Sequence, residues 1–355
     1  MTTLFQFHVN SNSRARIAVV IPARNEARIV SDTVRLTRSV LSSEDALFVI
    51  ADHCLDNTAS KAHASGAEVF ERKDAIALNK GAALRWFVLE AEAQLKKFDV
   101  IVVLDADSRV ASDFAEQIKV RIGISRQAWQ CWVSPVDYES SPVATIAALS
   151  ETIEQRIFDS IREMLAWPVR LRGTGMVFSP EVLINACAQV RTEVEDVSLT
   201  LLLVANGVPV QPLPNAIVYD PKPQTHVGAA RQRARWIRGQ WFAFWLHRKE
   251  VLKIILRGPQ GWSVLSSLFL KPRWIVILAK VLALGICFLA KQIYPAAILG
   301  TWLLIDLLIF MFGLRLMRAG IPGFRVFLQL PRFVLMWLQS IVIAGHQATW
   351  LRAQK

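Results

Sequence analysis

The chain has 355 residues, which is long enough for one large domain and a further segment. Hydrophobic residues make up 53% of it and the mean hydropathy is +0.33, values that are high for a soluble enzyme, and the excess lies after residue 262. The net charge of +12 indicates an anionic partner: nucleic acid, a membrane surface or a phosphorylated substrate. The four cysteines lack metal-ligand spacing and are expected to be buried and reduced in a cytosolic compartment. Residues 1–16 have no apolar core, so no signal peptide is expected.

Strands that alternate with helices are predicted over the first hundred residues. Short apolar runs predict strands at Ile17–Ile21, Leu47–Ala51 and Ala67–Phe70, and helical spacing of apolar residues follows the first of them. A long helix is expected from Asn79 to about Lys97. This alternation predicts an α/β fold with a mostly parallel, Rossmann-like sheet. No G-x-G-x-x-G sequence occurs, which argues against a dinucleotide cofactor.

The segment DVIVVLDADSRV (Asp99–Val110) places two carboxylates at the end of a strand. Val100–Leu104 is apolar and mostly β-branched, which is typical of a strand buried in a parallel sheet. Asp105 and Asp107 follow it directly, and ligands of open α/β sheets bind at the carboxyl ends of strands. Carboxylate oxygens suit Mg²⁺ or Mn²⁺. A solvated turn after a strand is the alternative for D-x-D taken alone.

The middle of the chain combines turns, helices and polar motifs. A weakly amphipathic helix is expected around 142–165, and Arg172-Gly173-Thr174-Gly175 precedes a short strand at Met176–Phe178. Ser179-Pro180 has the order of a helix N-terminus, a cap followed by proline. Glu195-Asp196 also opens a predicted helix, and acidic residues favour that position even without a catalytic role.

Seven segments, in chain order, resemble the family 2 glycosyltransferases: IPARNE, ADHCLDNT, NKGAAL, LDAD, GTG, ED and QRARW. They are similar more narrowly to the membrane-integrated branch that contains cellulose, chitin and hyaluronan synthases and exopolysaccharide glycosyltransferases. The resemblance covers roughly residues 16–245. It implies a GT-A fold, a nucleotide-diphosphate sugar donor, a divalent metal and inversion at the anomeric carbon.

The resemblance also assigns residues to the donor and to the metal. It implies that Asp105 and Asp107 bind the metal, Mg²⁺ or Mn²⁺, and Asp107 is expected to be the direct ligand. Ala51 stands where the family often has a second acid, which leaves the choice of nucleotide base open although UDP is expected. Lys80 has a second interpretation, a solvent-exposed lysine at a helix N-terminus. The residues that match donor-binding positions are Pro22, Glu26, Asp52, Lys80, Asp105 and Arg235.

On the acceptor side the resemblance makes Asp196 the general base, because a sugar hydroxyl is a poor nucleophile near neutral pH. In the Q-x-x-R-W motif, Arg235 offers a planar fork for the leaving diphosphate, and Trp236 a flat face against a sugar. Leu171-Arg172 replaces aromatic residues that the family often has here, so the sugar platform is expected to differ. His226 is either a third metal ligand or, as is more usual for a lone histidine, structural. The expected acceptor-binding residues are Gly173, Thr174, Gly175, Gln232 and Trp236.

The C-terminal third has the composition of a membrane segment. Between Arg231 and Arg257, basic residues are interleaved with tryptophan and phenylalanine, a pattern that nucleic-acid binding would share. The apolar sequence that follows favours an interfacial amphipathic region (231–270) on an anionic membrane. Spans are expected at about 274–290 and 296–313. The segment at about 324–345 is expected to be an interfacial helix, with a third span as the alternative.

Basic residues flank the two spans on their outer sides: Lys271, Arg273, Arg315 and Arg318. By the positive-inside rule, the catalytic domain faces the cytoplasm in a multi-pass protein of the inner (cytoplasmic) membrane. Each span carries one ionisable residue, Lys280 and Asp306, at depths of about 9 and 10 Å by helical rise. Because unpaired charges in a bilayer are costly, we expect these two side chains to face each other; the alternative is a lysine that reaches the head groups.

The predicted domains are an N-terminal tail (1–15), a GT-A catalytic domain (16–230), the interfacial region (231–270) and a membrane region (271–355). The expected function is sugar transfer from a nucleotide donor to a glycan or lipid-linked acceptor in polysaccharide biosynthesis, with membrane lipids but no nucleic acid as partners. A processive synthase is the alternative within this class. Two spans are few for a complete channel, so a processive enzyme would need a homo-oligomer or an export partner. A non-catalytic protein that senses nucleotides or glycans is the alternative of another class.

Overall fold

Eight strands of the described chain form one mixed sheet, in the order β3-β2-β1-β4-β7-β6-β8-β5. The computed structural model describes residues 15–73, 79–121, 127–139, 141–269, 273–317, 335, 337 and 339–344. Neighbours from β3 to β4 are parallel, β7 is antiparallel to both β4 and β6, β6 and β8 are parallel, and β5 is antiparallel to β8. The strands are β1 (Ile17–Ala23), β2 (Ala46–Asp52), β3 (Glu68–Arg72), β4 (Val100–Val103), β5 (Arg109–Val110), β6 (Ala128–Val136), β7 (Met176–Phe178) and β8 (Val210–Pro221).

The chain divides into two compact units, which are described separately. The first consists of Met1–Val136, Arg162–Pro221 and Gly239–Leu256, and the second of Asp137–Ile161, Lys222–Arg238 and Arg257–Lys355. The predicted domain boundaries stay predictions, because units defined by packing need not coincide with functional domains. The predicted tail (1–15) lies outside the described residues except for Ala15.

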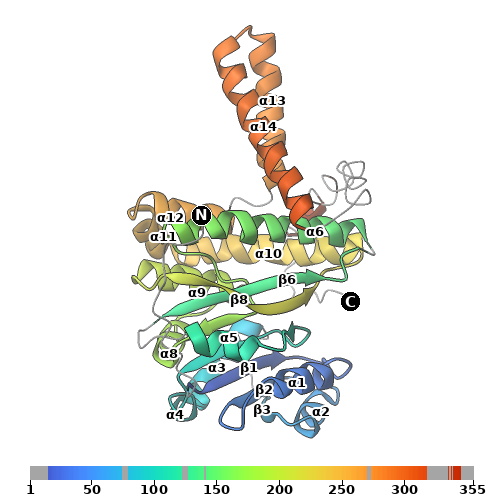
Figure 1. Ribbon diagram of the computed structural model, residues 1–355, viewed down its shortest axis with the longest axis vertical. Coiled ribbons are helices and arrows are strands. Elements are labelled where there is room, and N and C mark those ends of the chain that lie inside the picture. The colour runs from blue at the N-terminus through green and yellow to red at the C-terminus, as the bar shows by residue number, and fades with distance from the viewer. Residues whose placement is uncertain are drawn as a thin grey trace. The chain divides into compact units, whose positions relative to one another are not determined.

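Helices cover both faces of the sheet in the first unit (Figure 1). Side chains of β1 alternate between the faces: Ile17, Val19 and Ile21 pack with α1, α2 and α5, whereas Ala18 and Val20 pack with α3, α4, α8 and α9. Burial on both faces explains why the central strands are apolar runs rather than alternating sequences. These helices are α1 (Val30–Ser39), α2 (Thr58–Ala64), α3 (Lys80–Glu90), α4 (Glu92–Leu95), α5 (Phe114–Arg121), α8 (Pro180–Cys187) and α9 (Glu195–Ala205).

Two helices, α7 and α10, contain boundaries between the units along the chain. The predicted helix around 142–165 is present as α6 (Pro142–Ile153), a π-helical turn (Glu154–Asp159) and α7 (Ser160–Met164), and the π-helical turn was not expected. α10 (His226–Leu246) carries the Q-x-x-R-W motif and is followed by α11 (Arg248–Ile255) and α12 (Pro259–Phe269). All four cysteines are free, and only Cys131 and Cys187 are buried.

In the second unit, α13 (Arg273–Leu289) and α14 (Ile293–Leu316) form an antiparallel hairpin (Figure 1). Lys280 Nζ donates a hydrogen bond to Asp306 Oδ2 at 2.6 Å, so the predicted pairing between the two helices is confirmed. The ammonium group also lies 5.4 Å from the centre of the Trp302 ring. At the far end of α14, Leu314 packs with Leu149 and Ile153 of α6.

The hairpin differs in its bounds from the predicted spans. Of the described helices only α14 is long and apolar enough to cross a membrane; Val276–Leu289 of α13 is a shorter apolar helix. α14 begins before the expected residue 296 because Pro295 occupies its first turn, where a missing N–H costs no hydrogen bond. Most of the predicted helix at 324–345, together with Lys271 and Arg318, lies outside the described residues.

Candidate active site

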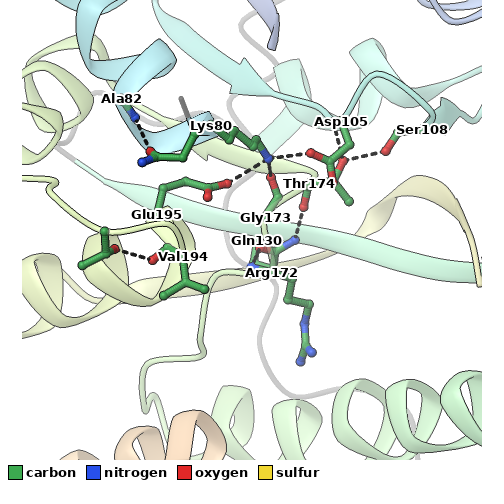
Figure 2. A network of polar contacts seen from close by, with 12 residues as sticks. Lys80, Ala82, Asp105, Ser108, Gln130, Arg172, Gly173, Thr174, Val194 and Glu195 are labelled. Carbon is green, nitrogen blue, oxygen red and sulfur yellow. Dashed lines mark hydrogen bonds and ion pairs between the residues drawn. The ribbon is translucent and has the colours of Figure 1, made fainter. Parts of the chain in front are cut away.

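The ammonium group of Lys80 joins three segments that are far apart in the sequence (Figure 2). Its Nζ donates to Asp105 Oδ1 at 2.6 Å and to the carbonyl oxygen of Gly173 at 2.5 Å, and lies 2.9 Å from Glu195 Oε1. The first group follows β4, the second lies in the loop before β7, and the third begins α9. One cation therefore holds the D-A-D, G-T-G and E-D motifs together.

The start of α3 explains why Lys80 reaches this position. Asn79 caps the helix, since its Oδ1 accepts a hydrogen bond from the Ala82 N–H at 2.8 Å. Gly81 lets the first turn approach the chain before α9: a Cβ there would lie 2.9 Å from the Thr192 carbonyl oxygen and 3.1 Å from Glu195 Cβ. The sequence Asn-Lys-Gly thus supplies the cap, the cation and the close approach in three successive residues.

The charge of Lys80 is stabilised by its neighbours. Burial alone would lower the pKa of this amine, but the carboxylates of Asp105 and Glu195 raise the pKa well above its ordinary value. Lys80 therefore stays protonated across the pH range in which enzymes work. The alternative of a solvent-exposed lysine is wrong, because only 21% of the side chain is exposed.

Thr174 connects the G-T-G loop to the strand end of β4. Its Oγ1 accepts a hydrogen bond from the Asp105 N–H at 3.1 Å and lies 2.8 Å from Ser108 Oγ. Thr174 is 2% exposed, so its hydroxyl acts inside the protein. We conclude that Thr174 fixes the backbone of the D-A-D motif, a role that the sequence did not indicate.

Gln130 of β6 supports the same loop from the other side. Its Nε2 donates to the Thr174 carbonyl oxygen at 2.9 Å, and its Oε1 accepts from the Arg172 N–H at 2.8 Å. Gly175 has φ +64, and a Cβ there would lie 2.9 Å from Cys131 Cβ, so glycine is required. The side chain of Arg172 points away from the Lys80 cluster (Figure 2).

Asp196 begins α9 beside Glu195. Burial raises the pKa of the Asp196 carboxyl to about 6, and the negative charge of Glu195 adds to this, whereas Arg170 and Lys80 partly oppose it. A carboxylate with this pKa is mostly ionised at neutral pH and more basic than an ordinary aspartate. It has the properties that a general base requires.

A second polar group lies where β1 and β2 end. Asp52 is 4% exposed, and its Oδ1 lies 3.1 Å from Arg72 Nη1 and 3.0 Å from His53 Nδ1. His53 has φ +50, a left-handed conformation that is uncommon outside glycine and tends to occur at functional sites. Pro22, in β1, pairs with Ile50 of β2, and the Glu26 N–H donates to Thr58 Oγ1 at 2.7 Å. The predicted base-binding residues thus lie at one edge of the sheet.

A family model, Glycosyltransferase like family 2, matches residues 15–239. The chain belongs to this family. It is a glycosyltransferase, and the predicted membership of family 2 is confirmed, whereas the narrower membrane-integrated branch stays a prediction. Family membership also favours an enzyme over a non-catalytic sensor. A search of curated protein sequences finds no match.

Solved structures place the fold of this glycosyltransferase. Mannosyltransferase PcManGT from Pyrobaculum calidifontis, in complex with GDP-Man and Mn²⁺, matches with a TM-score of 0.53 and 14% identity, over 97% of this chain and 90% of that one. Glucosyl-3-phosphoglycerate synthase from Mycobacterium tuberculosis, with Mn²⁺, UDP and phosphoglyceric acid, matches with a TM-score of 0.39 and 20% identity, over 59% and 72% of the two chains. The first match supports the GT-A fold, and the α/β, GT-A part of the predicted fold class is confirmed; more than one C-terminal transmembrane helix stays a prediction.

Asp105 and Asp107 are the residues of this glycosyltransferase that are predicted to hold a divalent metal. Among the described residues no group of three histidine, cysteine or acidic side chains is arranged for metal binding. The D-A-D carboxylates nevertheless fit a Mg²⁺ or Mn²⁺ ion, because such ions take one or two carboxylates and complete their shell with water and substrate phosphates. Lys80 pairs with one oxygen of Asp105, and the expectation that Asp107 is the direct ligand stays a prediction.

Gln232, Arg235 and Trp236 lie on α10 of the glycosyltransferase, within its second unit. Trp236 is 45% exposed. Their roles toward the donor and acceptor stay predictions, and so does the ligand role of His226, which lies in the same unit. Within the first unit the structure brings together four residues of the predicted set: Lys80, Asp105, Gly173 and Thr174.

Three residues of this site were missed by the sequence analysis. Glu195 pairs with Lys80, Gln130 holds the G-T-G loop, and Arg170 interacts electrostatically with Asp196. Only Glu195 had a signal in the sequence, its position next to the predicted base. Gln130 contacts Arg172, which lies 42 residues later in the chain, and Arg170 acts on Asp196, which lies 26 residues later. No local sequence pattern predicts interactions over such separations.

Proposed function

We propose that this glycosyltransferase transfers a sugar from a nucleotide-diphosphate sugar, with UDP as the expected nucleotide, to a hydroxyl of a glycan or lipid-linked acceptor. The observation that carries the proposal is the Lys80 cluster, since it ties the D-A-D strand end to the α9 turn that carries Asp196. An inverting sugar transfer needs carboxylates that hold the metal and the donor diphosphate, and a second carboxylate that acts as the base.

In the proposed reaction Asp196 accepts the proton of the acceptor hydroxyl. The oxygen of that hydroxyl forms a bond to the anomeric carbon of the donor, and the bond from that carbon to the diphosphate breaks. The sugar configuration inverts, and the nucleoside diphosphate leaves with the electron pair. Positioned bases of this kind contribute about 10²–10⁴-fold to the rate.

The leaving diphosphate carries negative charge that must be stabilised. A Mg²⁺ or Mn²⁺ ion held by Asp107 and Asp105 would supply that stabilisation when bound. We assign the remaining stabilisation to Arg235, whose fork can bind two phosphate oxygens. PcManGT, of similar fold, is described in complex with GDP-Man and Mn²⁺, which supports a nucleotide sugar and a divalent metal for this chain as well.

We further propose that the enzyme acts at the inner membrane with its catalytic unit in the cytoplasm. α14 has a mean hydropathy of 2.2 over its most apolar 18 residues, of which 11% are buried within the protein. A helix so apolar and so exposed is suited to lipid. The charge pair between Lys280 and Asp306 supports α13 as its partner in the bilayer, because it pairs the one acidic or basic residue of each predicted span, 274–290 and 296–313.

The test is a panel of nucleotide sugars given to the purified full-length protein, with and without Mn²⁺, while nucleoside diphosphate release is measured. We expect one donor to support metal-dependent release that increases with an added glycan or lipid-linked acceptor. Absence of release with every donor, under conditions in which the protein is folded, would contradict the proposal.

A further inference from the structure

A surface pocket of about 360 Å³ lies in the first unit, between α9 and the start of α11. It belongs to the catalytic unit but contains none of the residues assigned above to donor, metal or base. Its lining is strongly basic and includes Arg191, Leu202, His247, Arg248, Lys249 and Glu250. We asked which ligand these side chains would bind.

The cations of this pocket retain donors that the protein does not use. Arg191 donates from Nη1 to the Ala188 carbonyl oxygen at 2.9 Å, and Arg248 from Nη1 to that of Trp245 at 3.3 Å. A guanidinium has five N–H donors, so most of them remain available. Lys249 makes no hydrogen bond or ion pair with any residue that the structure describes. Three cations around one cavity favour a phosphate group.

The back wall of the pocket is connected to the catalytic turn. His247 is 5% exposed, and its Nε2 lies 3.1 Å from Ser198 Oγ on α9. Ser198 Oγ lies 2.7 Å from Thr192 Oγ1, which donates to the Val194 carbonyl oxygen at 3.0 Å. Val194 directly precedes Glu195 and Asp196. A chain of buried hydrogen bonds therefore runs from the pocket to the residue before the E-D motif.

A second contact fixes the same turn. Gly239 packs so closely on Val194 that a Cβ at residue 239 would lie 2.6 Å from Val194 Cγ1. The segment 239–250 thus holds the turn before α9 at two points: Gly239 packs on Val194, and His247 is hydrogen-bonded to it through Ser198. A ligand that changes how this segment is held will also change how Asp196 is held.

The surroundings of the pocket indicate where the phosphate comes from. Large apolar side chains of the segment 239–250, of the rest of α11 and of the residue after it are exposed: Trp241 at 65%, Trp245 at 53%, Leu252 at 56% and Leu256 at 78%. Soluble phosphates do not need such neighbours, whereas the interface of an anionic membrane offers apolar chains next to phosphate groups.

We propose that this pocket binds the phosphate group of an anionic phospholipid, and that its occupancy positions Asp196 through the chain His247–Ser198–Thr192. The proposal rests on the proposed membrane location. A phosphate bound by Arg191, Arg248 and Lys249 would connect the chain before α9 with the start of α11. These are the two segments that flank the hydrogen bond between His247 and Ser198. The effect falls on kcat, because the donor site is untouched.

The test compares the full-length enzyme in nanodiscs of phosphatidylcholine, with and without phosphatidylglycerol. We expect phosphatidylglycerol to raise kcat at least about fivefold, the lower end of ordinary coupling between two sites. Arg248→Gln with Lys249→Gln should abolish this stimulation while keeping the activity measured in phosphatidylcholine. Lys253→Gln with Arg257→Gln removes the same charge from the same stretch without touching the pocket, and should keep the stimulation at saturating lipid.

Ser198→Ala tests the connection to the base separately. It breaks the hydrogen bond from His247 and should retain lipid binding but lose the stimulation of kcat. Hydrogen exchange of residues 192–200 gives a readout that does not depend on transfer: phosphatidylglycerol should slow exchange there in the wild type, but not in the Arg248/Lys249 variant.

Three results would overturn the proposal: no effect of phosphatidylglycerol on kcat or on exchange, equal loss of stimulation in both double variants, or equal stimulation by soluble glycerol phosphate. Absence of transfer in every nanodisc would instead contradict the proposed function, and hydrogen exchange would then decide whether the pocket binds lipid.

Discussion

Lys80 Nζ and Asp105 Oδ1 lie 2.6 Å apart, although helices α3 and α4 and strand β4 lie between the two residues in the chain. Their contact means that the first carboxylate of the D-A-D motif is partly neutralised by the protein itself. Because the same ammonium pairs with Glu195, its removal would leave two carboxylates without their shared cation.

We therefore predict that Lys80→Met destabilises the catalytic unit. The loss should be about 1.5–3 kcal/mol, the range for hydrogen bonds to charged groups, which corresponds to a Tm lower by roughly 3–12 °C. Since Lys80 also lowers the pKa of Asp196, the acidic limb of kcat/KM should move to higher pH. Thermal unfolding and a pH–rate profile measure these effects, with Lys80→Arg as the charge-conserving control. An unchanged Tm and profile in Lys80→Met would rule out the bridging role.

Removal of Asp107 tests the metal assignment. Asp107→Ala should abolish Mn²⁺-dependent donor binding, because one carboxylate fewer leaves a weak site for a hard cation. Calorimetric titration of UDP with and without Mn²⁺ measures this. Asp32→Ala, which removes an exposed carboxylate on α1, is the matched control and should bind as the wild type does. Equal metal-dependent binding in Asp107→Ala would show that the ion is held elsewhere.

The Lys280–Asp306 pair predicts a specific pattern of rescue. Either single neutralisation, Lys280→Met or Asp306→Leu, should lower the folded yield in detergent because it leaves one charge unpaired. The double variant Lys280→Met/Asp306→Leu should recover most of that yield, since apolar pairs replace buried ion pairs with little loss. The swap Lys280→Asp/Asp306→Lys should recover less, because the cation would no longer lie over Trp302. A double variant no better than the worse single one contradicts the pairing.

The raised pKa of Asp196 predicts a stability effect that depends on pH. The native carboxyl has a pKa of about 6 and the ordinary value is 3.8, so the folded state holds the proton more tightly than the unfolded one. Stability is therefore lost as pH rises between these values, and the ionised group destabilises the protein above pH 6. A rise of about two pKa units corresponds to about 3 kcal/mol, so Asp196→Asn should raise Tm by roughly 6–12 °C at pH 8 and change it little near pH 3.5. A lower Tm at pH 8 would contradict this reasoning.

Local sequence patterns predicted the strands and motifs that consist of consecutive residues. The apolar run before Asp105 forms β4, Met176–Phe178 forms β7, and α9 begins at Glu195 as expected. β8 was missed because Pro212, Pro214 and Pro221 make the sequence resemble a loop, and the pairing of β6 with β8 accommodates this with a register shift at Cys131 and Trp132.

The long-range parts of the site could not be predicted. Nothing near Lys80 in the sequence indicates that its partners are Asp105, Gly173 and Glu195, since these contacts depend on the order of strands in the sheet. The helix expected from Asn79 to Lys97 is broken at Ala91, whose φ of −101 and ψ of 16 are not helical. The Lys280–Asp306 pair was predictable because helical rise alone fixes the depth of each residue.

The central claim is that Asp196 is the base for sugar transfer from a nucleotide donor. The most direct measurement compares the wild type and Asp196→Asn in one preparation, with donor affinity from titration and turnover from nucleoside diphosphate release. The account predicts unchanged donor affinity and a turnover lower by about 10²–10⁴-fold in the variant. Turnover near that of the wild type, with donor bound equally well, would remove Asp196 from the reaction and contradict the account.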